Sequence, residues 1–279
     1  MTAPIDYLLQ LADNALVLGQ RNAEWCGHGP ILEEDLALSN NSLDLIGQAR
    51  LLYQHAATLI NADATEAARF AHLHGARTQG QLTEDTLAYF RDEHAFYNFT
   101  LLELPHHGPL AGTASATRDF ATTITRNFLY SALMLLAWDR LQASTDAQLA
   151  AIAAKSLKEV RYHLRHAADW LVRLGDGTAT SHQRAQAALN HLLPYCQEFW
   201  DTPAAQQQAA ANGSGVVLAD LQADWNALVN QTLSEATLQR PAQPTGYVPQ
   251  GQRGVHSEHM GYLLAEMQSL ARRHPQAVW

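Results

Sequence analysis

Cysteine and charge are both scarce in this chain of 279 residues. Cys26 and Cys196 are the only cysteines and form no C-x-x-C pair, so nothing indicates a disulfide framework. Charged residues make up 16% of the sequence, and the 27 acidic residues outnumber the 18 basic ones, which gives a net charge of −9. This balance argues against a dedicated binder of nucleic acids or anionic membranes.

A long apolar run is also missing. The most apolar helical stretch lies between Arg126 and Asp139, which is too short a segment to cross a bilayer. The first residues, MTAPIDYLLQLADNALVLGQ, show acidic side chains and a helical period instead of a basic region followed by an apolar core. We therefore expect a cytoplasmic protein, and the 47% of apolar residues supply a sizeable core.

Motifs of nucleophilic and phosphate-binding chemistry are absent as well. The chain has no G-x-S-x-G elbow and no glycine-rich loop between a strand and a helix. The alternation typical of strands is nearly absent, whereas helical periodicity dominates.

The predicted helices are long and mostly joined by short connections. They are Ile5–Cys26, Ile31–Asn61, a short one at Thr65–His74, Thr83–Pro105, Asp119–Ala143, Asp146–Leu174, Ser181–Trp200, Ala219–Leu238 and His256–His274. Prolines and glycines make Gln239–Gly254 an extended loop before the last helix. Such helices pack as an antiparallel bundle, and the lack of a fixed repeat argues against a solenoid.

Acidic and imidazole side chains share one face of the predicted helix Asp146–Leu174. Glu159, His163 and His166 are four and then three residues apart. A ferritin-type di-iron centre instead takes Glu-x-x-His from each of two helices and a Glu from each of two more. Because Tyr162 stands three residues after Glu159, this helix does not supply the second ligand.

One Glu-x-x-His sequence occurs in the chain, at Glu103–His106. Its third residue is Pro105, which ends a helix, so we do not expect the two side chains to share an inward-facing turn. The sequence therefore predicts a bundle of the metalloenzyme type without an intact di-iron centre.

A zinc-like site is a second possibility for the histidines. His163 and His166 could face His256 and His259, because two i,i+3 pairs on neighbouring helices can hold an ion tetrahedrally. The alternative, which we favour, is that Tyr162, His163 and His166 form hydrogen bonds to carboxylates or backbone groups.

The segment RDEHAFYNF at residues 91–99 combines charge, aromatic rings and an amide. It could line a ligand cleft, with Arg91 meeting an anion and Phe96 or Tyr97 stacking on a flat group. The alternative, which we favour for the aromatic residues, is a salt bridge and part of the core, since Asp92 and Phe96, or Phe96 and Phe99, have helical spacing.

Three long stretches carry a more specific signal than any of these short motifs. They read RNAEWCGHGPILEEDLALSNNSLDLIGQAR at Arg21–Arg50, KSLKEVRYHLRHAADWLVRLGDG at Lys155–Gly177 and GVHSEHMGYLLAEMQSLARRHPQAVW at Gly254–Trp279. Together they resemble the PaaC family, the C subunit of the multicomponent phenylacetyl-CoA epoxidase of aerobic phenylacetate degradation. The resemblance extends over nearly the whole chain and is weakest in Ala62–Gln81 and Thr202–Val217.

The resemblance implies a single ferritin-like helical domain over residues 1–279. It also implies a non-catalytic structural subunit without a cofactor of its own, paired in a heterodimer within a larger complex with an A subunit that carries the di-iron centre. The family's RDE-x-x-F-x-N stretch matches Arg91–Asn98 here. By that resemblance Ala95, Phe96, Tyr97 and Asn98 border a cleft for a CoA thioester, although alanine at position 95 provides no side-chain amide.

Two other functions are compatible with the residues. The first is an autonomous di-iron oxygenase with atypical ligands, for which Glu159, His163 and His259 are the candidates. The second is a helical interaction scaffold without an oxygenase partner.

Overall fold

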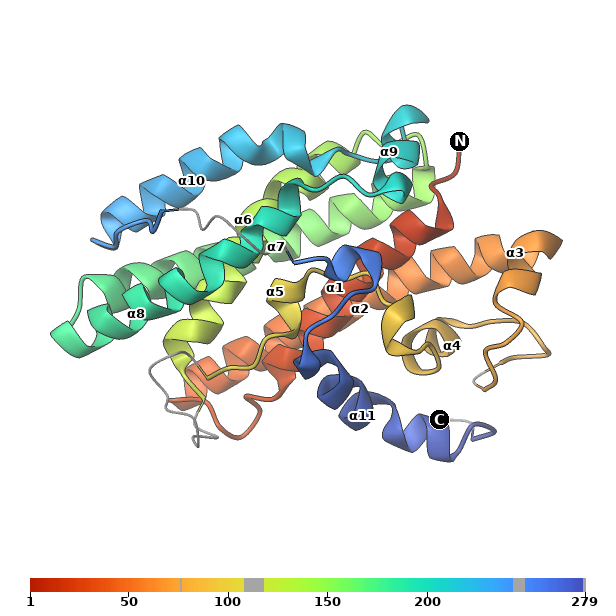
Figure 1. Ribbon diagram of the computed structural model, residues 1–279, viewed down its shortest axis with the longest axis horizontal. Coiled ribbons are helices and arrows are strands. Elements are labelled where there is room, and N and C mark those ends of the chain that lie inside the picture. The colour runs from red at the N-terminus through yellow and green to blue at the C-terminus, as the bar shows by residue number, and fades with distance from the viewer. Residues whose placement is uncertain (76, 108–117, 243–248, 278–279) are drawn as a thin grey trace.

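The predicted all-α fold is confirmed by the computed structural model, which describes residues 1–75, 77–107, 118–242 and 249–277 (Figure 1). Within these ranges there is no β-strand, and the only strand-like pairings are isolated bridges at Thr78–Gln81 and Gln250–Val255. None of the described helices is both long and apolar enough to cross a membrane.

Seven longer helices form most of the molecule. They are α1 (Ile5–Ala23), α2 (Leu32–Ala62), α6 (Phe120–Leu141), α7 (Ala147–Gly175), α8 (Ala179–Leu192), α10 (Gln222–Glu235) and α11 (Glu258–Arg273). The shorter segments are α3 (Ala64–Arg69), α4 (Glu84–Tyr89), α5 (Thr100–Glu103), α9 (Ala204–Ala211) and the 3₁₀ turns η1 (Glu93–Ala95), η2 (Leu193–Trp200), η3 (Leu218–Leu221) and η4 (Gly251–Arg253).

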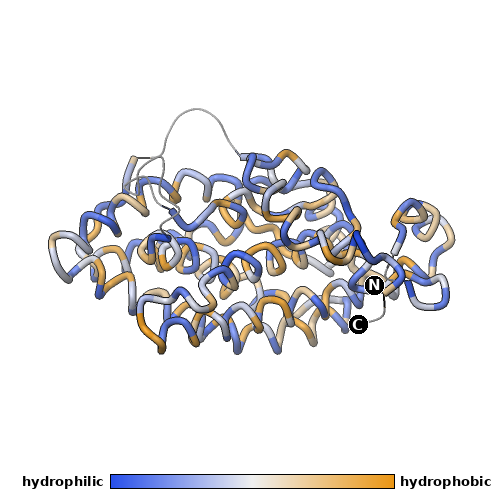
Figure 2. The backbone as a smooth tube through the Cα atoms, turned by 90° about the horizontal axis from the view of Figure 1, so that it is seen from below, coloured by the Kyte–Doolittle hydropathy of each residue, from blue (hydrophilic) through white to orange (hydrophobic). Residues whose placement is uncertain are grey.

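The centre of the fold is a ferritin-like bundle of α1, α2, α6 and α7. Helix α1 packs along α2, α6 packs along α7, and α2 and α7 join the two pairs. Helices α8 and α10 flank α6 and α7 on the other side, as Figure 1 shows. Hydrophilic and hydrophobic residues alternate around most of these helices (Figure 2), so each turns an apolar side toward its neighbours.

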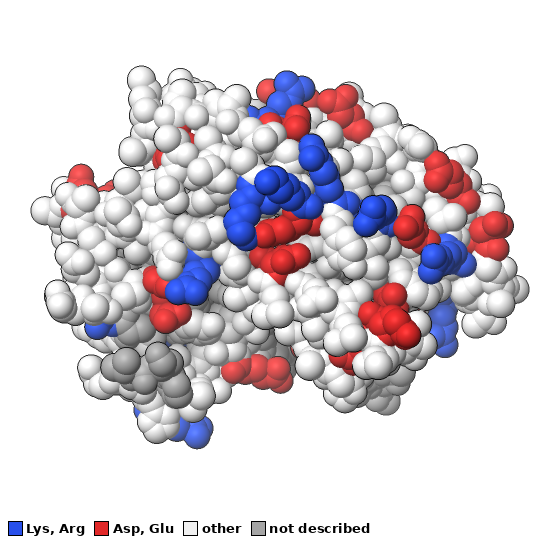
Figure 3. Space-filling view, turned by 180° about the vertical axis from the view of Figure 1, so that it is seen from behind, with Lys and Arg blue, Asp and Glu red and all other residues white. Residues whose placement is uncertain are grey.

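Helices α6 and α7 show two ways in which sequence dictates burial. Most residues of α6 are buried, because α7, α8 and α10 all pack against it. Helix α7 buries only one side, which includes Leu149, Ile152, Leu157 and Val160 at helical spacing. Charged side chains are sparse on the face in Figure 3, where basic and acidic groups lie side by side and leave broad uncharged areas.

The single helix predicted over Thr83–Pro105 is wrong. The chain forms α4, the turn η1 and α5 instead, with an extended stretch between η1 and α5. Two backbone N–H groups of this stretch, those of Tyr97 and Phe99, donate to the side chains of Asp13 and Asn14 at 2.8 Å each. These bonds to α1 replace the hydrogen bonds that a continuous helix would form. The break in the helix is therefore set by contacts with α1 and not by the local sequence.

Other differences lie at helix ends. The predicted helix Ser181–Trp200 becomes the tighter 3₁₀ turn η2 after Leu192, because Pro194 cannot continue the α-helical hydrogen bonds. The short helix predicted at Thr65–His74 ends at Arg69, and α9 was not predicted. In the loop predicted over Gln239–Gly254 the described part contains η4, while residues 243–248 lie outside the described residues. The assignment of residues 1–279 to one domain stays a prediction.

Candidate functional site: a polar cavity in the bundle

A small polar cavity lies where the four bundle helices meet. Its volume is about 10 Å³, enough for about one water molecule. All four helices contribute to its wall. The lining residues are Leu18 and Asn22 from α1, Asn41 and Leu45 from α2, Asn127, Tyr130 and Ser131 from α6, and Val160 and His163 from α7.

Neutral amides dominate the polar part of this wall. Asn22, Asn41 and Asn127 are all buried. Among the described residues, Asn22 Oδ1, Asn41 Oδ1 and both amide atoms of Asn127 find no hydrogen-bond partner. Buried polar atoms usually have hydrogen-bond partners. Three amides with unpaired atoms around one cavity therefore distinguish it from the rest of the core.

The cavity wall follows the layout of a ferritin-type di-iron centre, with different chemistry. In that centre two helices each give a Glu and two give Glu-x-x-His. Here α1 gives Asn22, α6 gives Asn127, α2 gives Asn41, and α7 gives Val160 followed three residues later by His163. Asp44, three residues after Asn41, does not line the cavity.

These residues do not fit a di-iron centre, because iron needs several carboxylates to balance its charge in a low dielectric. Within the described ranges, no three residues of the His, Cys, Asp and Glu types are placed so that they could hold a metal ion.

His163 also takes part in a series of bonds between α7 and α2. Its Nε2 lies 3.0 Å from Asp44 Oδ2, and one turn further His166 Nε2 lies 2.8 Å from Glu34 Oε2. The preferred prediction, that these two histidines bond to carboxylates between helices, is confirmed.

The three candidate metal ligands do not come together as one set. Of Glu159, His163 and His259, only His163 lines the cavity. Glu159 accepts a hydrogen bond from Gln48 at 2.9 Å and pairs with Lys155 on the helix surface. His259, on α11, packs edge-on against His107, with ring centroids 6.4 Å apart.

The two predicted histidine pairs do not face each other. His163 and His166 contact α2, whereas His256 Nδ1 lies 2.8 Å from Glu103 Oε2 and its Nε2 lies 3.0 Å from the carbonyl oxygen of Phe96. Burial by itself would lower the pKa of His256, but the hydrogen bond and charge of Glu103 outweigh it, so the pKa is raised.

Comparison with known proteins assigns the chain to a family. A family model described as "Phenylacetic acid catabolic protein", which carries the names PaaA and PaaC, matches residues 1–279. The chain is also 42% identical over 273 residues to the C subunit of 1,2-phenylacetyl-CoA epoxidase from Escherichia coli (strain K12), and the match covers 98% of each chain.

The chain belongs to the phenylacetic acid catabolic protein family. The resemblance seen in the sequence is thereby confirmed.

In the RDE-x-x-F-x-N stretch, Arg91, Phe96 and Asn98 are buried at a junction between helices, whereas Asp92 and Glu93 are exposed. Arg91 is 1% exposed, donates from Nη1 to Asp13 Oδ2 at 3.2 Å and also binds Asp13 through Nη2. Its guanidinium lies 4.2 Å from the centroid of the Phe96 ring. The anion that Arg91 meets is therefore an internal carboxylate on α1.

The four predicted ligand residues belong to this junction. Phe96 and Asn98 are fully buried, and Ala95 and Tyr97 are half-buried. Asn98 Nδ2 donates to Glu103 Oε2 at 3.1 Å, which links the stretch to α5. Whether these residues border a CoA cleft stays a prediction.

The side chains of Glu103 and His106 have different hydrogen-bond partners. Glu103 faces Asn98 and His256, whereas the His106 ring lies 2.5 Å from the carbonyl oxygen of Arg21 and 2.7 Å from Thr123 Oγ1. Burial, followed by the charge of the nearby Arg126, holds the pKa of His106 well below its usual value. Helix α5 ends at Glu103, so His106 lies beyond it, and the expectation that the two side chains do not share one inward-facing helical turn is confirmed.

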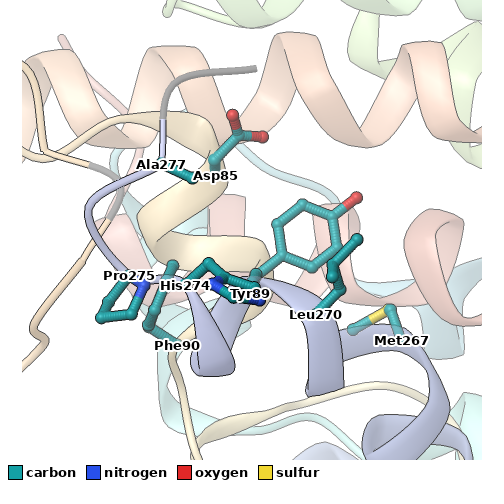
Figure 4. A pocket seen from close by; sticks show the side chains of 9 residues that line it. Asp85, Tyr89, Phe90, Met267, Leu270, His274, Pro275 and Ala277 are labelled. Atoms are coloured by element: carbon teal, nitrogen blue, oxygen red, sulfur yellow. The ribbon is translucent and has the colours of Figure 1, made fainter.

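A larger groove, of about 290 Å³, lies between α4 and α11 (Figure 4). Tyr89, Met267 and Leu270 line it together with the carboxyl group of Asp85. Burial raises the pKa of Asp85, and the neighbouring Glu84 adds to that shift. None of the four predicted ligand residues lines this groove.

The sequence prediction missed the asparagines of the cavity. The Glu-x-x-His pattern does not include them, because it requires a carboxylate where these positions carry an amide. A signal was present: Asn127 interrupts the most apolar helix of the chain, and Asn41 and Asp44 have the i,i+3 spacing.

Proposed function

We propose that this chain is a non-catalytic structural subunit of a phenylacetyl-CoA epoxidase, and that it supports a catalytic A subunit which carries the di-iron centre. The proposal rests on the relative, which is named as the C subunit of that enzyme, and on the chemistry of the bundle centre. A subunit of a multicomponent enzyme has partner subunits, and the A subunit is the one we propose.

The amide cavity is the observation that carries the non-catalytic part of the proposal. Oxygen activation at two irons requires inward-facing carboxylates from all four helices. The wall has Asn22, Asn41, Asn127 and Val160 at the corresponding places. The bundle is kept and its redox chemistry is lost, so the remaining role is contact with another chain. The cytoplasmic location and the presence of further subunits stay predictions.

Iron content and activity test this proposal. The chain is purified without added metal and then incubated with ferrous iron, and bound iron is measured by elemental analysis. We expect well below two irons per chain and no oxygen-dependent turnover of phenylacetyl-CoA by the chain alone. Co-expression should make the A subunit soluble and active. Two bound irons per chain, or an A subunit that is equally soluble and active alone, contradicts the proposal.

The autonomous oxygenase with Glu159, His163 and His259 as ligands makes the opposite prediction. Turnover by this chain alone, abolished by His163→Ala and kept in a control variant of the exposed His72, would support it.

A further inference from the structure

His256 lies in the link between η4 and α11, and both of its ring nitrogens face hydrogen-bond acceptors. Its Nδ1 lies 2.8 Å from Glu103 Oε2, and its Nε2 lies 3.0 Å from the carbonyl oxygen of Phe96. A carbonyl oxygen cannot donate a hydrogen bond, so Nε2 carries a proton. The side chains of His256 and Glu103 are both 0% exposed, so water does not take the place of either partner.

The other partners of Glu103 show where the second proton resides. Its Oε1 accepts the backbone N–H of Ser257 at 2.5 Å, and its Oε2 also accepts from Asn98 Nδ2 at 3.1 Å. Three donors around one carboxyl group favour the ionised form, which accepts at both oxygens. The proton of the third bond then belongs to Nδ1 of His256. The ring is therefore an imidazolium, protonated at both nitrogens.

The groups around the ring favour this positive charge. Burial opposes it, whereas the hydrogen bond and the charge of Glu103 on α5 support it. The carbonyl oxygen of Phe96 and the charge of Glu93 on η1 act in the same direction as Glu103, so the pKa of His256 is raised above its usual value of 6.5. On α11 itself, the nearby Glu258 is also acidic, and its side chain is 82% exposed.

The basic side chains nearby bond to other groups. Arg21 of α1 donates from Nη2 to the backbone carbonyls of Glu103 and His259, at 2.7 Å and 3.2 Å, and its Nη1 pairs with Glu24. Burial lowers the pKa of His259, and the charge of Arg21 adds to that shift although Glu258 opposes it. The protonated ring of His256 is therefore the cation that directly binds the buried carboxylate of Glu103.

The Glu103–His256 pair attaches the chain just before α11 to α5. Helix α11 packs against α1, α4, α5 and η1 (Figure 1). The preceding turn η4 is attached separately, because Glu198 on η2 accepts the backbone N–H of Gln252 at 2.8 Å. Further along α11, Gln268 donates from Nε2 to a backbone carbonyl between α4 and η1 at 3.0 Å. Loss of the pair therefore affects the first turns of α11 and leaves the rest of the helix attached.

We infer that the protonated ring of His256 is a pH-sensitive attachment, which holds the first turns of α11 to α5 and releases them when the ring loses a proton. Without this proton, Nδ1 presents a lone pair to the carboxylate, and Glu103 is left as a buried charge without its counter-charge. Local opening of the helix brings Glu103 into contact with water and removes this cost. The inference concerns contacts within one chain and does not depend on the proposed function.

The sign of the pH dependence follows from the raised pKa of His256. The stabilising effect of the proton is complete below the unfolded pKa of about 6.5 and is lost as the pH rises through the higher pKa of the folded state. The first turns of α11 should therefore open more often in mildly alkaline solution than in mildly acidic solution.

The protonation state of the ring can be measured directly. The full chain is labelled with ¹⁵N-histidine, and the His256 signals are assigned by their absence in His256→Gln. At pH 6 we expect both ring nitrogens of His256 to show the chemical shifts of protonated nitrogens. A ring with only one protonated nitrogen at pH 6 overturns the inference, whether or not the variant is stable.

Hydrogen exchange measures whether the proton holds the helix. After correction for the intrinsic pH dependence of exchange, protection of the amides in residues 257–264 should fall at least about fivefold between pH 6 and pH 8.5. Protection of α6 should change by less than about twofold over the same range. In His256→Gln, which keeps a donor but cannot become charged, protection of residues 257–264 should be low at both pH values. The matched control is His72→Gln, which changes an exposed histidine and should behave like the unchanged chain.

A third variant separates His256 from the neighbouring carboxyl group of Glu198. Glu198→Gln should keep the pH response of residues 257–264, because the Glu103–His256 pair is intact. If Glu198→Gln removes the response while His256→Gln keeps it, Glu198 controls the attachment and the inference is wrong. An unchanged chain whose protection in residues 257–264 does not vary with pH also contradicts it.

Discussion

At the scale of single residues, polar groups in the core fall into two kinds. Asp13 and Arg91 are almost fully buried and paired, with Tyr53 and the backbone N–H of Tyr97 as further partners of the carboxylate. The cavity amides are equally buried but have unpaired atoms. The first kind fixes the packing of α1 against the chain between α4 and α5, and the second lines the small cavity between the four bundle helices.

Substitution of Asp13 should reduce the stability of the fold far more than loss of a surface ion pair does. Asp13→Ala leaves the Arg91 guanidinium buried without its counter-charge, which we expect to lower the free energy of unfolding by about 3–5 kcal/mol. The control Asp92→Ala removes an exposed partner of Arg272, 2.9 Å away, and should cost less than about 1 kcal/mol. Urea denaturation measures the loss of unfolding free energy in both variants. Equal losses would show that the buried ion pair contributes no more to stability than the exposed one.

Glu198 should make stability depend on pH. Burial raises its pKa from 4.5 to about 7, even though the backbone N–H groups of Gln252 and Thr100 donate to its carboxyl group. The folded protein therefore binds this proton more tightly than the unfolded chain. Its stabilising contribution is complete below the unfolded pKa and is lost as the pH rises through about 7, on the order of 3 kcal/mol in total.

Glu198→Gln should flatten this part of the pH profile. Chemical denaturation of the variant and the unchanged chain at several pH values between 5 and 8 provides the measurement. A variant that loses stability with rising pH as steeply as the unchanged chain would exclude Glu198 as the source.

At the scale of helices, ends and interruptions depend on particular side chains. Asp146 begins α7: its Oδ1 accepts from the N–H groups of Gln148 and Leu149 at 3.1 Å. Its other oxygen accepts from Ala3 N–H and lies 2.8 Å from His55. One carboxylate thus starts α7, holds the amino terminus and contacts α2.

Asp146→Ala should therefore weaken more than one element. Loss of a cap alone costs about 1 kcal/mol, and we expect about 2–4 kcal/mol here because the carboxylate also bonds to Ala3 and His55. The matched control is Asp63→Ala, which removes the cap of the short, exposed α3. Denaturant midpoints compare the two, and a similar loss in both would contradict the wider role.

The same carboxylate has a definite pH dependence. Burial would raise the pKa of Asp146, but the hydrogen bonds from Ala3, His55 and Leu149 outweigh it and the pKa is lowered. Its contribution is therefore present above the unfolded pKa and is lost as the pH falls through the lower pKa of the folded state.

At the scale of the whole molecule, a neutral centre is combined with an apolar outer face. The bundle buries its four helices around amides and leaves leucines of α2 uncovered. Monomeric proteins seldom leave such side chains grouped on one helix, and grouped exposed apolar residues are typical of a contact surface.

The sequence by itself determined the fold class and most long helices. Apolar residues recur at helical spacing in α1, α2, α6 and α7, so those elements form wherever a partner covers their apolar sides. The sequence also showed that a second Glu-x-x-His is absent, because the spacing of ligands along one helix is a local property. The family was recognisable for the same reason, since long stretches of matching residues need no coordinates.

Only the tertiary structure decided which polar residues meet. Asn22, Asn41 and Asn127 are far apart in the chain and share a cavity because three helices pack together there. The break between α4 and α5 likewise depends on bonds donated to Asp13 and Asn14 of α1. Such contacts follow from how helices are placed in space, and a periodic pattern along one helix does not contain that information.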